Sequence, residues 1–598
     1  MKVQFNTPPV ILRLLLLFIL WFSLSLLLRI PATSEIEPTR FFSMLVPSFL
    51  AFSLSAFMWK FSRAFFYSYF FFLCLYLPIP YFKLSEHILL LPGEIVGAFC
   101  VGTFSFSLIW YLYFLYRSLR NTFMRLFSLF LFLLDSFIAF LVPLIFIVYY
   151  FINGQLLTAD ILLAVFQTNP EEALSYLYMN GIIPWVIGIL AFFILLYAFI
   201  RFIKAQPFSQ SKLRHLVLYS ISFILIGVYF APRSTVFYPF NITRSSIQVL
   251  HTFKDYGLAK EQRQAHLASL PNLFIEPKAG GVHVLVIGES ETRDHMHVYG
   301  YSRNTTPWLD SFSTENGSIL FSHAYSNHTH TVPVLTYALT AKNQYNHISL
   351  ADAFSIMEVA KAAGYETWWI SNQQKYGAFD TPTAEIASIA NHELWLNKNL
   401  GNQVASWQYD AAIIPHLSSL QLQGNAFIVI HLMGSHFGYS DRYPKEFTQF
   451  SGNIHAIDTY DNSIFYTDFV LKQIYESFAS NPDFRSFIYF SDHGEAPTSG
   501  GHESTKFAWP MSHIPLIMHF SPQFQEKQSA IYSTLAMNKD KCWTNDLLYE
   551  AMLSILGIQG IPDHNGSFDL ASSQYAMTPQ NLYTLHGQKQ LSEDPSLS

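Results

Sequence analysis

Two stretches of the sequence hold side chains that could bind a metal ion. Glu289 follows the apolar run Val284–Ile287 after one glycine, and Asp492 and His493 follow the apolar run Phe487–Phe490 after one serine. Carboxylate oxygen and imidazole nitrogen together suit zinc, and adjacent Asp and His side chains can reach one ion where the chain turns. Separately, Glu289 could be a solvated loop acid and Asp492 a helix cap beside a surface histidine. Considered together, the three residues predict a metal site.

Two further histidines occupy comparable places in the sequence. His436 follows another apolar run, in FIVIHLMGSHFG, and His502 follows the glycine-rich segment after His493. A single histidine in such a place is more often structural. As a pair, His436 and His502 could form a second site, either for a further zinc ion or for the oxygens of a phosphate group.

A cluster of hydroxyl side chains supplies a candidate nucleophile. The segment SNHTHT, which begins at Ser326, precedes a run whose start resembles a helix N-terminus, where free backbone NH groups suit a phosphate. Thr329 is the candidate, because coordination to zinc can lower the pKa of a threonine hydroxyl, which alone is a weak nucleophile. Thr331, Ser326 and Thr336 are rivals, and helix capping is the alternative role for the cluster.

These residues require a framework of strands that end side by side. Apolar runs without polar alternation are typical of strands that are covered on both faces, as in a parallel sheet. Helices are predicted over Leu350–Ala363 and Asp458–Ala479, and their alternation with strands favours an α/β domain with a mostly parallel sheet. Ligands in such sheets collect at the carboxyl ends of the strands. The predicted strands are His283–Gly288, Glu366–Ile370, Ala426–Leu432, Phe487–Phe490 and Leu516–Phe520.

The composition indicates that much of the chain lies in lipid. Hydrophobic residues make up 51% of the 598 residues and charged residues 13%, which is too apolar for an ordinary soluble protein. The net charge of -6 gives no sign of a nucleic-acid partner, which would require a basic surface. Apolar stretches of roughly the 20 residues that cross a bilayer predict spans near residues 10–30, 41–59, 64–82, 93–116, 126–151, 182–203 and 213–231.

This distribution predicts four parts of the chain. Residues 1–235 form a polytopic membrane domain of five to seven helices, and residues 236–280 form a linker with bridging helices. Residues 281–572 form the α/β domain, and residues 573–598 form a polar C-terminal tail of the kind that is often disordered. Basic residues gather in the loops on one side of the spans, which should be cytoplasmic. The α/β domain then lies on the opposite, extracytoplasmic face.

The motifs GESETRDHMHVYGYSRNTTP, SNHTHT, IHLMGSHFGYSDRYP, TYDNS and SDHGE…GGHES, in this order behind a membrane region, resemble those of the phosphoethanolamine transferases of Gram-negative inner membranes. That family belongs to the alkaline phosphatase and sulfatase superfamily. The resemblance implies a multi-pass inner-membrane enzyme with a periplasmic catalytic domain. It also implies that Thr329 becomes phosphoethanolaminated and that His436 and His502 are the second-site histidines. The implied zinc ligands, for one ion and possibly more, are Glu289, Thr329, Asp492 and His493.

The same resemblance implies the substrates. The donor would be phosphatidylethanolamine from the surrounding membrane lipid, and Asn372 and Lys375 resemble residues near the donor headgroup. The acceptor would be lipid A, the lipopolysaccharide core or another envelope glycan. The lipid A enzymes, however, place a disulfide-forming cysteine in the nucleophile loop, where this chain has Asn327 and His328. This departure leaves the acceptor open.

Two alternatives differ in donor or in chemistry. A phosphoglycerol transferase of the same superfamily would use phosphatidylglycerol, and a membrane-anchored binding protein would keep the fold without catalysis. A sulfatase would need a CxPxR-type segment for conversion to formylglycine, and the sequence contains none.

Overall fold

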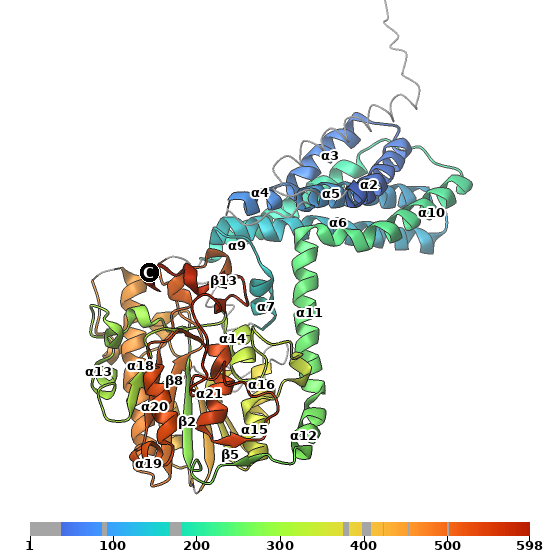
Figure 1. The fold of residues 1–598 in the computed structure, drawn as a ribbon. Coiled ribbons are helices and arrows are strands. Elements are labelled where there is room, and N and C mark those ends of the chain that lie inside the picture. The colour runs from blue at the N-terminus through green and yellow to red at the C-terminus, as the bar shows by residue number, and fades with distance from the viewer. Residues whose placement is uncertain are drawn as a thin grey trace, which may run out of the picture. The chain divides into compact units, whose positions relative to one another are not determined.

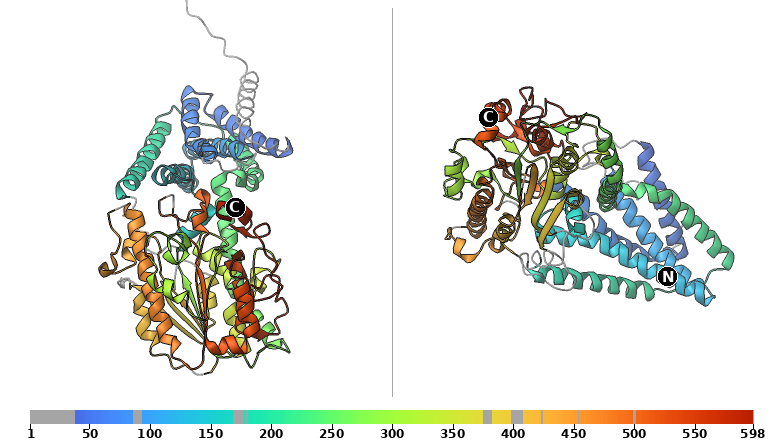
Figure 2. Two further views of the ribbon diagram at one scale, coloured as in Figure 1. Left: turned by 60° about the vertical axis from the view of Figure 1, so that its left-hand side comes forward. Right: turned by 90° about the horizontal axis from the view of Figure 1, so that it is seen from below.

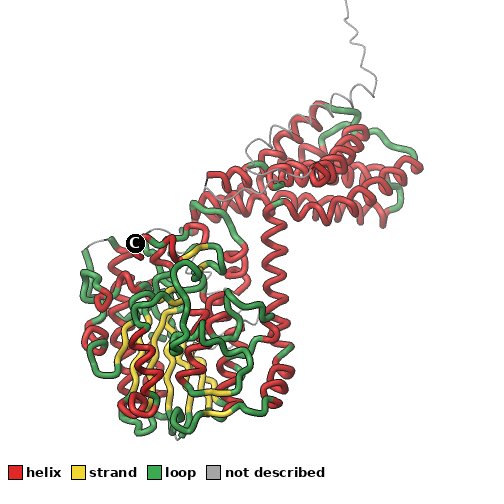
Figure 3. Tube along the Cα trace, viewed as in Figure 1, coloured by secondary structure: helices red, strands yellow, loops and turns green. Residues whose placement is uncertain are grey.

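The structure is a computed structural model in which the chain divides into two compact units. The first comprises residues 1–165 and 170–248, and the second comprises residues 166–169 and 249–598. Helices make up the first unit and strands occur in the second (Figures 1 and 3). The structure describes residues 38–85, 93–167, 177, 181–374, 382–397, 408–422, 424–452, 454–498 and 501–597.

The first unit contains apolar helices, as the composition predicts. Among its described residues, five segments are long and apolar enough to cross a membrane, namely Arg63–Ser85, Glu94–Ser118, Thr122–Asn153, Ile182–Lys204 and Leu213–Val236. The predicted span near residues 41–59 corresponds to the helix α2, and the one near residues 10–30 lies outside the described residues. The helices are α2 (Pro38–Met58), α3 (Arg63–Tyr76), α4 (Pro78–Ser85), α5 (Glu94–Ser118), α6 (Thr122–Asn153), α7 (Ala159–Gln167), α9 (Ile182–Lys204) and α10 (Leu213–Phe230).

Helix α5 is the centre of this unit. Most of its length is buried, and its neighbours α2 and α6 pack along it. Two hydrogen bonds fix α2 against α5, because the Ser55 hydroxyl donates to the carbonyl of Ser107 and the Trp59 indole donates to the carbonyl of Trp110. Such bonds between helices satisfy polar groups that lipid cannot satisfy.

The connection between the two units is helical. After α10 the chain forms the short 3-10 helix η1 (Ala231–Val236), followed by α11 (Tyr238–Leu258) and α12 (Lys260–Ser269). Residues 236–280 therefore contain the bridging helices that the sequence predicts, and α11 contributes to both units.

A seven-stranded sheet forms the core of the second unit, in the order β3-β9-β8-β2-β7-β5-β6. The pairs from β8 to β6 are parallel, whereas β9 is antiparallel to both of its neighbours. The predicted, mostly parallel sheet is thus confirmed, and the edge strands β3 and β6 were not predicted. The strands are β2 (Val282–Gly288), β3 (Ser318–Leu320), β5 (Glu366–Gln374), β6 (His392–Asn397), β7 (Ala426–His431), β8 (Phe484–Ser491) and β9 (Leu516–Phe520).

Helices cover both faces of this sheet, which explains why its central strands β2, β7 and β8 are buried throughout and largely apolar. Leu285 and Ile287 of β2 contribute to one hydrophobic core, and Val284 and Val286 contribute to the other. The first core includes α14 (Thr331–Ala338), α15 (Ile356–Ala363), α20 (Ser529–Met537) and α21 (Leu548–Ile555), and the second includes α13 (Pro307–Phe312) and α18 (His455–Ala479), as can be followed in Figures 1 and 2. Alternate residues of one strand therefore enter two separate cores.

The C-terminal residues do not form the disordered tail that the composition suggested. They belong to the second unit and contain the hairpin of β12 (Tyr583–Thr584) and β13 (Lys589–Gln590). Leu582 and Leu591 are fully buried. Asp594 accepts a hydrogen bond of 2.7 Å from the Tyr325 hydroxyl, and its Oδ2 lies 2.7 Å from His513 Nε2. The segment is polar on average, but Leu582, Leu591 and Asp594 hold it against the rest of the unit.

The Asp594 contacts should stabilise the second unit at neutral pH. Burial raises the pKa of Asp594, but the bonds from His513, Tyr325 and Ser596 outweigh it and hold the pKa below its usual value. We expect Asp594→Asn to cost about 2 kcal/mol, as for other buried hydrogen bonds to a charged group, and to lower the unfolding temperature of the full-length protein in detergent.

Because a depressed carboxyl pKa contributes stability above the unfolded value and loses it on acidification, the difference from wild type should shrink as the pH falls below about 4. Glu593→Gln, at an exposed position one residue earlier, is the matched control. Equal unfolding temperatures for Asp594→Asn and wild type at neutral pH would contradict this role.

Candidate metal centre and nucleophile

The pairing of β2 with β8 places the three predicted metal ligands together. In the register of this pair Gly288 lies opposite Ser491, so Glu289 and Asp492 leave the sheet at the same level. His493 Nε2 lies 3.4 Å from Glu289 Oε1 and 3.6 Å from Asp492 Oδ2, and all three side chains are buried. One ligand atom from each residue therefore lies within 4.8 Å of the others.

A strained turn after β2 holds Glu289 in this position. Ser290 has a φ of 58°, in the left-handed region that a non-glycine residue rarely adopts. Three bonds hold it there: its amide donates to Asp492 Oδ1, its hydroxyl donates to Glu289 Oε1, and its carbonyl accepts from the Tyr460 hydroxyl. Gly434 packs against this turn so closely that a Cβ there would lie 2.7 Å from the carbonyl oxygen of Glu289.

The electrostatics of the three ligands favour a cation among them. Burial raises the pKa of Asp492 to about 7, and the charge of Glu289 adds to this effect. Burial lowers the pKa of His493, but the charges of Asp492 and Glu289 outweigh it and bring the value to about 10. Burial raises the pKa of Glu289, but His493 outweighs it and holds the value below the ordinary range. The protonated His493 thus compensates the two buried carboxylates.

The residues present fit a zinc ion by their chemistry. Asp492 Oδ2 is buried and has no hydrogen-bond partner within the described part of the chain. Such an atom is costly unless a proton or a metal compensates it. Two carboxylates and one imidazole also form the mixed oxygen and nitrogen donor set that zinc accepts. Glu289, Asp492 and His493 are therefore the residues that would hold the metal.

The structure brings Thr331, rather than the expected Thr329, to these ligands. The Thr331 hydroxyl donates a hydrogen bond of 3.0 Å to Glu289 Oε2, and it also influences the pKa of Asp492. The Thr329 hydroxyl instead lies 3.3 Å from His330 Nδ1. Thr331 is the first residue of α14, whose free backbone NH groups can bind a phosphate.

The other two rival hydroxyls are used elsewhere. Ser326 Oγ donates to the carbonyls of His328 and Asp492, and Thr336 Oγ1 donates to the carbonyl of Val332 inside α14. Among the four hydroxyls that the sequence offered, Thr331 is the one whose recorded partner is a metal-ligand carboxylate. These hydrogen bonds favour Thr331 as the candidate nucleophile, and the expectation for Thr329 stays a prediction.

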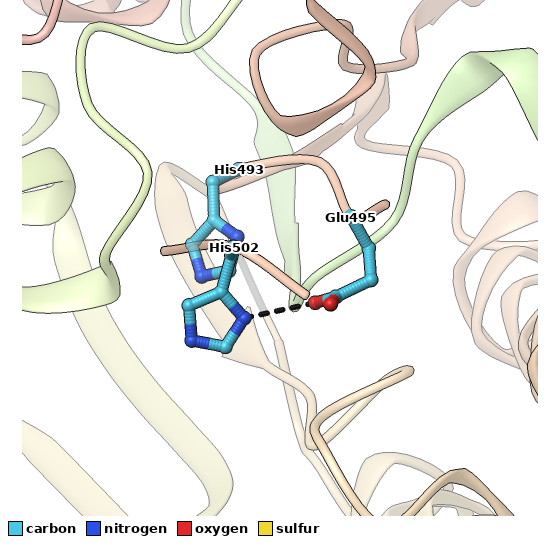
Figure 4. A group of neighbouring side chains, drawn as sticks. All are labelled: His493, Glu495 and His502. Atoms are coloured by element: carbon cyan, nitrogen blue, oxygen red, sulfur yellow. Dashed lines mark hydrogen bonds and ion pairs between the residues drawn. The ribbon is translucent and has the colours of Figure 1, made fainter. Parts of the chain in front are cut away.

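A second cluster adjoins the first through His493. His502 Nδ1 lies 2.9 Å from Glu495 Oε2, and the ring centroids of His493 and His502 are 4.7 Å apart (Figure 4). Glu495 Oε1 accepts a further hydrogen bond from the Tyr439 hydroxyl. His493, Glu495 and His502 form a second group of possible metal ligands. Sequence reasoning predicted His502 and missed Glu495, although Glu495 stands only two residues after His493 in the same motif.

His436 is half-buried near both clusters but is not a member of either group. Burial lowers its pKa to about 4, and the charges of Glu289, His502 and His493 act on it. Its Nδ1 has no hydrogen-bond partner in the described part of the chain. His436 is thus a neutral imidazole beside the site, which suits the second-site role expected for it without testing that role.

Asn372 belongs to β5, and Lys375 lies outside the described residues. The Asn372 amide donates a hydrogen bond of 2.8 Å to Asp410 Oδ1. Asp410 in turn accepts from the amides of Met433 and Gly434. Asn372 therefore supports the loop that packs against Glu289, and its expected place near a donor headgroup stays a prediction.

Glu291 is a second buried acid that sequence reasoning missed. It accepts hydrogen bonds from the hydroxyls of Tyr489 and Ser435, and burial raises its pKa to about 8. At neutral pH it is therefore largely protonated, and it adds little negative charge near Glu289, Asp492 and His493. The alternating acids of the segment GESE were the available signal, because a loop that leaves a buried strand cannot point both carboxylates into solvent.

Comparisons with known proteins support the family resemblance that the sequence motifs indicate. Residues 282–557 match the family model described as Sulfatase. Phosphoethanolamine transferase EptC of Escherichia coli (strain K12) is 28% identical over 384 residues, which cover 58% of this chain and 65% of that protein. Putative transferase YhbX of the same strain is 30% identical over 283 residues, which cover 45% of this chain and 49% of that protein. The chain thus matches just under two thirds of the length of EptC, and the expected resemblance is confirmed.

Solved structures show the same fold. The C-terminal periplasmic domain of EcEptC from Escherichia coli, in complex with Zn, aligns with a TM-score of 0.50 and 24% identity over 55% of this chain and 98% of that one. The integral membrane protein lipooligosaccharide phosphoethanolamine transferase A from Neisseria meningitidis aligns with a TM-score of 0.53 and 16% identity over 88% and 97%. A helical membrane region followed by a sulfatase-like α/β domain is therefore the fold of this chain.

Removing one ligand should abolish tight zinc binding at the first cluster. We expect Asp492→Asn and Glu289→Gln to weaken zinc binding by roughly 100-fold or more, because each leaves an incomplete donor set. Zinc per chain is measured by elemental mass spectrometry on the full-length protein after dialysis against a weak chelator. Asp441→Asn, which changes an exposed acid, is the control. Zinc contents equal to wild type in both ligand variants would rule this cluster out.

Proposed function

We propose that this chain, whose residues 282–557 form a Sulfatase-family domain, transfers phosphoethanolamine from phosphatidylethanolamine to an acceptor in the cell envelope. One observation carries the proposal: the hydroxyl of Thr331 donates to Glu289 Oε2 at the N-terminus of α14, beside Asp492 and His493. A nucleophile, a set of metal ligands and free backbone NH groups at one point suit attack on a phosphate ester. The names of the relatives supply the group that is transferred.

The first half of the reaction forms a covalent intermediate on the protein. Thr331 Oγ1 attacks the phosphorus of the donor, a new O–P bond forms, and the bond from phosphorus to the diacylglycerol oxygen breaks. Glu289 Oε2 accepts a hydrogen bond of 3.0 Å from the Thr331 hydroxyl and orients it, and the proton leaves to solvent as the hydroxyl ionises. A bound zinc ion would supply charge that lowers the pKa of the hydroxyl and stabilises the phosphate oxygens.

The leaving oxygen needs a proton when diacylglycerol departs. His502 uses Nδ1 for Glu495, so its Nε2 is the nitrogen that can serve the substrate. Glu495 is itself held by Tyr439, which fixes the orientation of the imidazole. We assign His502 to this proton transfer, with the half-buried His436 nearby.

The second half of the reaction regenerates Thr331. A hydroxyl or phosphate of the acceptor attacks the phosphorus of the phosphothreonine, the bond to Thr331 Oγ1 breaks, and Thr331 recovers a proton. Lipid A, the lipopolysaccharide core and other envelope glycans all offer such groups. The apolar helices of the first unit keep the enzyme in a membrane, where a lipid donor is present at high effective concentration.

The two alternatives make different demands on the site. A phosphoglycerol transferase would use the same nucleophile and metal ligands with a glycerol headgroup, so labelled phosphatidylglycerol and phosphatidylethanolamine supplied separately distinguish the donors. A binding protein without catalysis would not need the Thr331 hydroxyl beside two carboxylates. The presence of this hydroxyl beside Glu289 therefore favours an enzyme.

Replacing Thr331 should abolish the covalent step. We expect Thr331→Ala to lower transfer by at least about 1000-fold, since a catalytic nucleophile is removed, and to eliminate the phosphoethanolamine adduct that peptide mass spectrometry would detect on wild type without acceptor. Thr329→Ala is the matched control and should keep both the adduct and most of the activity. An adduct on Thr329, or full activity of Thr331→Ala, would overturn the assignment.

A further inference from the structure

A second pair of parallel strands lies beside the metal ligands. Strand β4 (Ala324–Tyr325) pairs in parallel with β10 (Trp543–Thr544), and the last residues of the two strands lie opposite each other. Ser326 and Asn545 therefore leave this pair at the same level. Ser326 begins the nucleophile loop, residues 326–331, and Asn545 begins the short 3-10 helix η10 (Asn545–Leu547). The loop and η10 thus start side by side.

The side chain of Asn545 joins the nucleophile loop to a metal ligand. Its Oδ1 accepts a hydrogen bond of 2.9 Å from the amide of Asn327 and one of 2.8 Å from Asn327 Nδ2. Its Nδ2 donates 2.7 Å to the carbonyl of Asp492 and 3.5 Å to Ser326 Oγ. A carboxamide has two donor hydrogens and two acceptor lone pairs. Asn545, which is fully buried, therefore uses its whole hydrogen-bonding capacity between these two segments.

The carbonyl of Asp492 is a point from which two metal ligands are oriented. It belongs to the peptide group that joins Asp492 to His493, so its direction affects both side chains. Ser326 Oγ donates a second hydrogen bond to it, of 2.7 Å. Groups that hydrogen-bond to metal ligands fix their orientation, and their loss typically costs roughly 10- to 100-fold in metal affinity. Asn545 and Ser326 are in this position with respect to Asp492.

The same bonds continue to the helix that carries the nucleophile. Asn327 Nδ2 also donates a hydrogen bond of 3.3 Å to the carbonyl of Val334 in α14. Thr331 is the first residue of this helix. A continuous series of hydrogen bonds therefore runs from the carbonyl of Asp492 through Asn545 and Asn327 to α14.

We propose that Asn545 is a positioning residue that fixes the nucleophile loop relative to the metal ligands. It acts through Asn327 on one side and through the carbonyl of Asp492 on the other. The inference rests on the proposed function and deepens it, because it names the group that holds Thr331 in place beside the metal ligands. A displacement of reacting groups by about 1 Å can lower a rate about 100-fold, so the link should affect the attack on phosphorus as well as metal binding.

The chain offers a matched control in Asn462 of α18. Its Oδ1 accepts hydrogen bonds of 2.8 and 2.7 Å from the amides of Gln449 and Phe450. Its Nδ2 donates to the carbonyl of Phe450 and to the Tyr443 hydroxyl, at 2.9 and 3.4 Å. Asn462 is 1% exposed and Asn545 0%. Alanine at either position therefore removes the same number of hydrogen bonds from an equally buried place, and the two variants should lose similar stability.

Zinc affinity tests the effect of Asn545 on the metal ligands. The affinity of the full-length protein in detergent is measured by competition with a chelator, and the unfolding temperature is measured in parallel. We expect Asn545→Ala to bind zinc about tenfold more weakly than wild type, and Asn462→Ala to bind it as wild type does at a similar loss of unfolding temperature. Equal zinc affinities in the two variants would overturn the proposed effect on the ligands.

The rate of adduct formation tests the effect on the nucleophile. At saturating zinc and phosphatidylethanolamine, without acceptor, a loss of folded protein lowers the amount of adduct on Thr331, whereas a misplaced nucleophile lowers the rate constant. We expect the rate constant of Asn545→Ala to fall about 100-fold, with the KM for the lipid unchanged, and that of Asn462→Ala to stay at the wild-type value. A wild-type rate constant in Asn545→Ala would overturn the proposal.

A double-mutant cycle identifies the link itself. Asn327→Ala breaks the same link from the other side and leaves Asn545 bonded to the carbonyl of Asp492. It should lower the rate constant as Asn545→Ala does, keep the zinc affinity of wild type, and add nothing further when the two substitutions are combined. Rate effects that multiply would show independent roles and overturn the proposal. Asn327→Ala also tests the link on its own if Asn545→Ala does not fold.

The two readouts separate this inference from the proposed function. Zinc binding requires neither Thr331 nor a lipid, so the comparison of Asn545→Ala with Asn462→Ala does not depend on catalysis. An absent adduct in wild type would contradict the proposed function alone, and zinc affinity would then decide the role of Asn545. An adduct in wild type that forms equally fast in Asn545→Ala would contradict the positioning role alone.

Discussion

The structure of the second unit depends on the parallel pairing of β2 with β8, because that pairing forces two carboxylates into one buried space. Glu289 and Asp492 follow paired residues and leave the sheet together. Two buried negative charges are unfavourable unless positive charge accompanies them. His493 provides that charge at 3.4 and 3.6 Å, and a divalent cation would provide it more completely. An ordinary threonine hydroxyl is a poor nucleophile, so the role proposed for Thr331 depends on this arrangement of charges beside it.

Much of the surrounding fold serves to keep these side chains in place. Ser290 is held in a left-handed conformation that costs of the order of 1 kcal/mol or more. The bond that its amide donates to Asp492 and the bond that its carbonyl accepts from Tyr460 on α18 offset this cost. Glu291 is largely protonated at neutral pH, so it adds little charge to the loop after β2. Gly434 has no side chain, so it can pack closely against the same loop. The layers of helices that cover both sheet faces keep water from the metal ligands and so strengthen their mutual interactions.

The sequence predicted the parts of the site that follow directly from buried strands. Uninterrupted apolar runs located β2, β7 and β8, and the residues after them included all three carboxylate and imidazole ligands. The choice between Thr329 and Thr331 could not be made in the same way, because the two differ by the exact residue at which α14 begins, and helix ends are poorly defined by sequence. Strands β3 and β6 lie at the edges of the sheet, where burial is less complete and the apolar pattern is weaker. The docking of the C-terminal segment depends on tertiary contacts of Leu582, Leu591 and Asp594.

The same C-terminal segment also supports the nucleophile loop. The amide of His586 donates to the carbonyl of Asn327, the His586 Nε2 lies 2.9 Å from Asn327 Oδ1, and the His586 ring stacks on Tyr337 of α14 at 4.3 Å. Leu585 and His586 both have positive φ values, a strain that these contacts offset. All three cysteines of the chain are free, so no disulfide holds this loop. Hydrogen bonds and ring stacking hold it instead, so that the position of Thr331 depends on the folding of the segment that contains His586.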